Sequence, residues 1–136
     1  MPYVSSTALN NGVDGFIREE PYSRVFNDCI SLANSGSVGS AFFEPFTYVA
    51  SDHVTALKRR GTNEYVNLFL VACIKKQASL FNFNREINEP RVQALQILLP
   101  ATDNKKPDYA FMELVGRSIA LRTLKRQQVF LSRLCP

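Results

Sequence analysis

Few side chains in this chain of 136 residues could carry acid–base or nucleophilic chemistry. The one histidine, His53, follows Ser51 and Asp52, and these are the residue types of a hydrolytic triad. The segment is expected to be extended. Because adjacent side chains on a strand point to opposite faces, the three groups cannot converge. We therefore interpret His53 as a structural histidine.

Metal-binding patterns are missing as well. No Cys-x-x-Cys pair, no Cys/His spacing suited to zinc and no carboxylate cluster suited to a metal occurs in the sequence. Pro107-Asp108 could begin a nuclease metal motif, but Leu114-Val115 follow Glu113 where an acid–x–lysine pattern is needed. The sequence therefore predicts no enzyme activity, no metal and no cofactor. Buried free thiols are expected at Cys29, Cys73 and Cys135.

Composition and charge set wider limits. The 16 Lys and Arg against 12 Asp and Glu give a net charge of +4, and 46% hydrophobic residues suffice for one core. This mildly basic balance permits nucleic acid as a partner without requiring it. No apolar run reaches the ~18 residues that span a bilayer, and the first residues do not read as a signal peptide. We expect a cytoplasmic chain with no membrane partner.

Three polar segments carry the side chains that nucleic-acid binding would need. Lys and Arg neutralise phosphates, and amide, hydroxyl and guanidinium groups reach base edges in the major groove. Each segment could equally be an ordinary solvated turn. The candidates are Ser6, Asn10 and Asn11 in a polar strip, Lys58, Arg59 and Arg60 in a basic turn, and Asn84 and Arg85 in an aromatic loop just after Lys76.

A glycine- and serine-rich loop at 34–40 has two interpretations. As a functional loop it would bring backbone N–H groups to a phosphate. As a structural loop it would connect two strands of a hairpin, and this interpretation is favoured. The loop cannot be a nucleotide-binding loop of the Rossmann or P-loop kind, because it leads into Ala41-Phe42-Phe43 and not into a helix.

The first part of the chain should be rich in strands. Short apolar runs separated by turn residues predict strands at 29–33, 41–43, 47–50 and 54–58, and an Asn-Gly turn at 11–12 should join two short extended pieces. A helix should follow from a cap at Asn63 to about Lys76, because Val66, Leu70 and Ile74 repeat at helical spacing.

The last part of the chain predicts a strand, a turn and a long helix. A short apolar strand at 96–99 should end at Pro100, and the helix should run from Pro107 at its first position to about Leu134. Such a helix is ~40 Å long, more than a domain of ~100 residues is expected to cover. We therefore expect its second half to project onto a partner helix, whereas the alternative is a helix folded back on its own domain. The expected seam is Leu114, Leu121, Leu124 and Leu131.

Five segments in this order resemble a known family. They are 1–13, 34–43, 50–54, Leu98-Leu99-Pro100 and 107–113. Together they resemble a target recognition domain of the specificity (S) subunit of restriction–modification systems, of type I or type IIB-like. The resemblance implies an α/β (mixed α+β) fold: a single domain with a twisted mixed sheet over residues 1–106, followed by a long helix for dimerisation and spacing over 107–136.

The resemblance also implies a function. Such domains are not catalytic; each reads part of a split duplex DNA sequence, and the helices space the domains and dock a methyltransferase subunit. A restriction subunit is a further candidate partner. The chain would be a half-subunit that forms a homodimer, or a fragment of a longer subunit.

We therefore expect sequence-specific recognition of double-stranded DNA that directs a partner methyltransferase or endonuclease. One alternative is an interaction module that dimerises through its C-terminal helix and does not bind DNA. A small nuclease or methyltransferase fragment is a second alternative, which lacks support because neither a carboxylate–lysine pattern nor a cofactor loop is found.

Overall fold

Two small sheets form the body of the domain in the computed structural model, which describes residues 1–77 and 89–134. Strands β1 and β6 run parallel and the other pairs are antiparallel. The predicted mixed α+β class is confirmed, and so are the predicted strands at 29–33, 41–43, 47–50 and 54–58. The first sheet has the order β2 (Val13–Phe16), β1 (Pro2–Val4), β6 (Tyr48–Ala50), β3 (Val25–Phe26), and the second has the order β5 (Ala41–Glu44), β4 (Cys29–Ala33), β7 (Val54–Leu57).

Strand β4 lies at the centre of the hydrophobic core. All five of its residues are buried, and its side chains alternate between two clusters. Ile30 and Leu32 belong to the cluster that contains α1, whereas Cys29 packs with residues of the first sheet such as Tyr48. A strand buried on both faces has to be largely apolar, which explains its Cys-Ile-Ser-Leu-Ala sequence.

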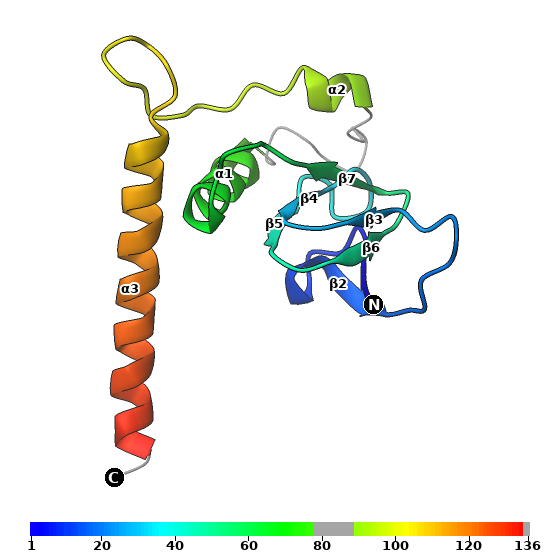
Figure 1. Cartoon of the computed structure of the whole chain (residues 1–136), viewed down its shortest axis with the longest axis horizontal. Coiled ribbons are helices and arrows are strands. Elements are labelled where there is room, and N and C mark those ends of the chain that lie inside the picture. The colour runs from blue at the N-terminus through cyan, green and yellow to red at the C-terminus, as the bar shows by residue number, and fades with distance from the viewer. Residues whose placement is uncertain (78–88, 135–136) are drawn as a thin grey trace.

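Helix α1 (Glu64–Gln77) covers the outer face of the second sheet (Figure 1). Its start is set by Asn63, whose side-chain oxygen accepts the backbone N–H of Val66 at 3.1 Å, as predicted for the cap. Val71 and Ile74 join the core cluster beneath it. The short helix α2 (Glu89–Gln93) follows.

The predicted strand at 96–99 is wrong. Residues 95–100 have no regular secondary structure, and Leu98 is 86% exposed. A strand is stabilised by pairing with a neighbour, and in the described residues this region has only an isolated bridge between Ala101 and Pro107. The segment instead crosses from α2 to the start of the last helix (Figure 1).

Helix α3 (Tyr109–Leu134) begins two residues later than predicted. Asp108 is its N-terminal cap, because Asp108 Oδ1 accepts the N–H of Phe111 at 2.9 Å. Pro107 therefore lies before the helix, in the bridge to Ala101, and not at its first position. Pro107 helps to close the 101–107 turn, and the aspartate rather than the proline starts the helix.

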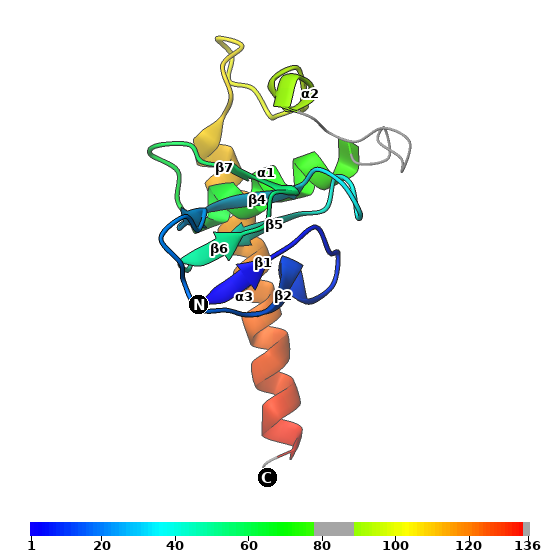
Figure 2. The same cartoon turned by 90° about the vertical axis from the view of Figure 1, so that its right-hand side faces the viewer.

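The first half of α3 packs along α1, and the second half extends beyond the body (Figures 1 and 2). Met112 and Gly116 are the buried residues of α3. Every residue from 121 to 134 is exposed. No helix within the described residues is long and apolar enough to cross a membrane. The division into domains at residue 106 stays a prediction.

Candidate nucleic-acid interface

Two polar loops from distant parts of the chain pack against each other. The N–H of Ser37 donates to the carbonyl of Ser6 at 3.0 Å, so the 34–40 loop lies on the loop that connects β1 and β2. Gly36 has a φ of +60°, and a Cβ on it would lie 2.8 Å from Ser6 Oγ. Both the backbone conformation and the close approach therefore call for glycine at this position.

The 34–40 loop connects antiparallel neighbours β4 and β5, as the hairpin interpretation predicted. The N–H of Ala33 donates to the carbonyl of Ser40 at 2.8 Å, which closes the base of the hairpin. Gly36, at the tip, is exposed. The structural interpretation is thus confirmed, and the tip remains available to a ligand.

Two lysines at the end of α1 lie on the same side of the body. Lys75 Nζ lies 4.0 Å from the ring centroid of Phe42 in β5, and Lys76 is exposed. Val38 packs against the core cluster that contains Ile74, so the hairpin loop is held beside the second half of α1. Figure 2 shows both loops and the C-terminal end of α1 on its right-hand side. We call this surface the loop face: residues 5–12, 34–40, Lys75 and Lys76.

Asn10 and Asn11 form the exposed tip of the first loop. A short 3₁₀ turn, Asn10–Gly12, gives them φ angles of +48° and +54°, which asparagine tolerates better than most residues. Both line a cavity of about 420 Å³ whose other described walls include Phe46, Glu64 and Leu68. Glu44 also lines this cavity, so its two carboxylates disfavour phosphates and the two amides suit base edges better.

The basic turn lies on the other side of the body. Figure 2 shows the segment between β7 and α1 on the left, away from the loop face. Lys58 Nζ donates to the carbonyl of Asn27 at 2.9 Å, and the Arg59 guanidinium lies 4.4 Å from the ring centroid of Tyr109. Arg60 is exposed. The structure therefore does not join Lys58, Arg59 and Arg60 to Ser6, Asn10 and Asn11.

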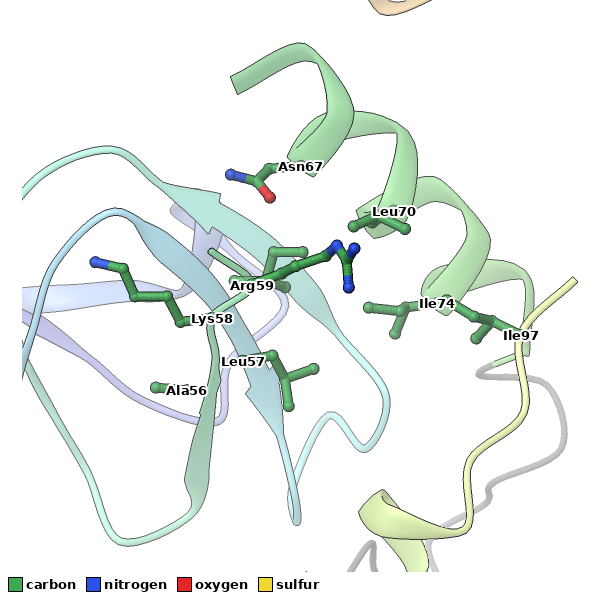
Figure 3. A pocket seen from close by; sticks show the side chains of 9 residues that line it. Ala56, Leu57, Lys58, Arg59, Asn67, Leu70, Ile74 and Ile97 are labelled. Carbon is green, nitrogen blue, oxygen red and sulfur yellow. The ribbon is translucent and has the colours of Figure 1, made fainter. Parts of the chain in front are cut away.

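A pocket between β7 and α1 was not foreseen from the sequence (Figure 3). Its volume is about 410 Å³. Arg59 points toward α1 in this view, whereas Lys58 points away from it. Its described lining holds no carboxylate, histidine or thiol, so the pocket lacks the groups of a catalytic site. The lining residues are Ile30, Ala56, Leu57, Lys58, Arg59, Asn67, Leu70, Ile74 and Ile97.

Asn84 and Arg85 were also predicted to contact nucleic acid. Both lie outside the described residues, as does Cys135. Among the described residues no group of three His, Cys, Asp or Glu side chains could hold a metal ion. His53 lies in an exposed turn before β7 and not in the expected strand, because the backbone turns at Ser51, whose carbonyl accepts the N–H of Val54.

The buried titratable groups are structural. Burial raises the pKa of the Cys29 thiol and of the Tyr48 hydroxyl, which lie 3.3 Å apart, so neither is poised as a nucleophile. Burial also raises the pKa of Glu44, and the hydrogen bond from Ser31 Oγ at 3.0 Å opposes this shift. Cys29 is buried as predicted, whereas Cys73 is only half-buried.

The predicted seam on the last helix is fully open. Leu114, Leu121, Leu124 and Leu131 are each 56–63% exposed. Ile119, Val129 and Phe130 add further exposed apolar surface to the same helix. Large exposed apolar patches of this kind mark interaction surfaces.

Comparison with known proteins identifies the family. The family model for the type I restriction modification DNA specificity domain matches residues 1–130. The chain belongs to this family. The resemblance seen in the sequence is thereby confirmed, and the match includes both the body and most of α3.

One curated relative is similar over most of this specificity domain. It is the specificity subunit S.BcgI of the type II restriction enzyme BgcI from Heyndrickxia coagulans, 32% identical over 115 residues. The aligned region covers 83% of this chain and 33% of the relative, so the chain spans about a third of the relative's length. No solved structure matches the chain.

Proposed function

We propose that this specificity domain recognises a particular sequence in duplex DNA and directs a partner methyltransferase to it. The observation that carries the proposal is the family match over residues 1–130. A restriction subunit is a further proposed partner.

The loop face is the proposed contact with DNA. Lys75 and Lys76 would neutralise phosphates, and Ser6, Asn10 and Asn11 would meet base edges. Support comes from two contacts that link these segments. Ser6 lies tightly against Gly36, and the Phe42 ring lies beside both Gly12 and Lys75 Nζ. Rigid placement matters because base-edge hydrogen bonds tolerate little displacement.

Lys58 and Arg60 are proposed as weaker, peripheral phosphate contacts. The segment between β7 and α1 that carries them lies away from the loop face (Figure 2), and Lys58 is already bound to Asn27. Arg59 stacks on Tyr109, so Arg59→Ala would disturb the attachment of α3 as well as any contact with DNA. Arg59 alone is therefore a poor test of DNA binding.

The projecting half of α3 is proposed as the site of assembly. Its exposed leucines suit a helix of a second copy, which would make a homodimer with two reading domains. A methyltransferase subunit would then bind the assembled helices.

The test is selection from a randomised duplex library by the full chain together with its methyltransferase. We expect one enriched sequence and binding that weakens steeply with salt. Lys75→Ala/Lys76→Ala should reduce the slope of log affinity against log salt by about one for each phosphate that is no longer neutralised. Lys125→Ala/Arg126→Ala on the exposed projecting helix is the matched control for charge.

Base reading is tested separately with Asn11→Gly, which removes the amide and keeps the positive φ at no steric cost. This variant should relax selection at one or two positions and leave the salt slope unchanged. A library with no enriched sequence for the wild-type complex would refute the proposal.

The alternative is an interaction module that dimerises through α3 without touching DNA. The exposed apolar surface of α3 is the observation that favours it. This alternative predicts that the lysine variants change neither DNA binding nor the dimer. A metal-dependent cleavage assay of the isolated chain tests the enzyme alternative.

A further inference from the structure

Gly116 makes a very close backbone approach between α3 and the body. A Cβ on Gly116 would lie 2.7 Å from the carbonyl oxygen of Tyr65 and 2.8 Å from Tyr65 Cβ. The first of these atoms belongs to the backbone of α1 and cannot rotate away. Glycine weakens the interior of a helix relative to alanine, so helix propensity does not explain it here. The close approach of the α1 backbone explains why position 116 is a glycine.

Cation–π contacts hold α3 on either side of this approach. The Arg117 guanidinium lies 4.5 Å from the ring centroid of Tyr65 in α1, and Arg59 stacks at 4.4 Å on Tyr109 in the first turn of α3. Each contact joins an arginine of one element to a tyrosine of the other. The helix is thus attached at its start and again about two turns later.

A carboxylate completes the arrangement. Glu113 Oε1 lies 2.7 Å from Arg117 Nη2, which orients the guanidinium over Tyr65. Hydrogen bonds from Arg117 and then from Asn63, the cap of α1, lower the pKa of Glu113. We call these residues the joint: Arg59, Asn63, Tyr65, Tyr109, Glu113, Gly116 and Arg117.

We propose that the joint sets the angle at which α3 leaves the domain, and thereby the number of base pairs between the two half-sites that a pair of domains reads. The proposal rests on the DNA-reading function proposed above. Gly116 and Arg117 are positioning residues: they act through the direction of the helix and are not assigned any contact with DNA.

Because α3 is fixed at its start, a small shift at Gly116 rotates the helix and moves its far end by a larger distance. Its start is held by Arg59 and by the N–H of Asp108, which donates to the carbonyl of Pro100 at 2.8 Å. At 1.5 Å per residue, Gly116 lies about 12 Å from Asp108 and Leu134 lies about 39 Å from it. A Cβ at Gly116 needs about 0.7 Å more room to reach an ordinary 3.4 Å contact with Tyr65. The far end of α3 would then move by about 2.3 Å, since displacement grows in proportion to distance along the helix.

In a symmetric pair both domains move relative to the shared helices. The separation of the two reading faces would change by up to about 4.6 Å, which exceeds the ~3.4 Å rise of one base pair. At this upper limit, one methyl group at the joint changes the preferred spacing by a whole base pair.

The experiment uses the full chain with its methyltransferase. Library selection with the wild type defines the half-sites and the spacer, and affinities are then measured on duplexes whose spacer is lengthened or shortened one base pair at a time. Gly116→Ala should keep the same half-site bases and move the optimum by one base pair. Its affinity for the wild-type spacer should fall about tenfold, a decrease typical of one mismatched base pair.

Two controls separate positioning from general damage. Gly15→Ala makes the same substitution in β2, where a Cβ would meet nothing within 4 Å, and should keep the wild-type optimum. Arg117→Lys, which keeps a cation near Tyr65, should shift the optimum less than Arg117→Ala. A Gly116→Ala complex with the wild-type spacer optimum would overturn the proposal.

A second measurement does not depend on DNA. Spin labels at the exposed Phe16 of β2 and Ser132 of α3, in chains diluted with unlabelled protein, report the position of the helix end. Gly116→Ala should change this distance by about 2 Å, as the expected movement of the far end of α3 requires. An unchanged distance would refute the proposal that the joint sets the direction of α3, whatever the DNA result. A changed distance without any DNA selectivity would refute the proposed function and leave the role of the joint standing.

Discussion

The two halves of α3 both carry leucines and arginines but have opposite surroundings. In the first half Met112 is 0% exposed, and Gly116 is buried against α1. In the second half every residue from 121 to 134 is exposed, although Leu121, Leu124, Val129, Phe130 and Leu131 are apolar. The first half is thus part of the domain, and the second half is a surface that has no partner within the described residues of its own chain.

The two halves of α3 are stabilised in different ways. Isolated helices of fewer than about 12–15 residues are marginal in water, so tertiary contacts must hold most short helices. The first half receives such contacts from α1. The second half is stabilised by continuation from the first, and its apolar side chains would gain from burial against another helix.

Met112 and Leu131 make the sharpest test of this contrast. Met112→Ala should lower the free energy of unfolding by about 2–5 kcal/mol, because it removes a fully buried side chain and leaves a cavity. Leu131→Ala should change the stability of the monomer by less than about 0.5 kcal/mol, as for other exposed sites. Urea unfolding at a concentration where the chain is monomeric measures both. Equal losses would show that the second half is packed in the monomer.

Self-association tests the second half directly. Leu121→Asp/Leu124→Asp should convert a dimer to a monomer, because two charges would be buried in the helix interface. Sedimentation velocity measures the change. Thr123→Asp/Phe130→Asp adds the same charge at two exposed c positions of the heptad, off the a/d seam, and should leave the dimer intact. A dimer that survives the leucine variant would mean that assembly uses another surface.

The burial of Glu44 in the body can be tested by the pH dependence of the free energy of unfolding. Its folded-state pKa is raised by burial above the ordinary 4.5, so the folded protein binds more protons than the unfolded chain between these two values. The free energy of unfolding should therefore fall as pH rises through this interval. Glu44→Gln keeps an oxygen for Ser31 and cannot ionise, so it should be more stable than the wild type at pH 7. Thermal unfolding should show no such gain below pH 4.5.

Glu113 in the joint should show the opposite pH dependence and the smallest effect. Arg117 holds its folded-state pKa below the ordinary 4.5, so its contribution is present above pH 4.5 and is lost as pH falls through the folded-state value. Arg117→Ala should remove this acid-dependent loss and cause only a slight decrease in stability at neutral pH, because the ion pair is exposed. Acid unfolding of the wild type and of Arg117→Ala, followed by circular dichroism, measures this acid-dependent loss of stability. An unchanged acid profile would mean that the pair is not formed in solution.

Local signals predicted most of the elements correctly. The strand at 29–33, the hairpin loop at 34–40 and the cap at Asn63 depend on neighbouring residues only. The segment at 96–99 was predicted wrongly because an apolar run does not show whether a partner strand is near. Pro107 was wrongly predicted as the first helical residue. Both Pro107 and Asp108 can start a helix, and in the structure Asp108 is the N-terminal cap.

The candidate site was only partly predictable. Polarity and charge singled out Ser6, Asn11 and Lys76, but nothing local shows that the first loop packs on Gly36. Arg59 has the same sequence signal as Lys58 and Arg60, yet it stacks on Tyr109, a residue fifty positions later. The contact between Gly116 and Tyr65 has a weak signal, a glycine inside a helical pattern, which propensity alone does not explain.

Residue types and their spacing are enough to identify the family, the order of most strands and helices, and the leucines of the last helix. Only the folded chain shows which loops share a face and where α3 is held. These depend on contacts such as Ser6 with Ser37 and Tyr65 with Gly116, between residues more than thirty positions apart. Long-range packing, which no local pattern encodes, separates the surface proposed to read DNA from the joint proposed to set its spacing.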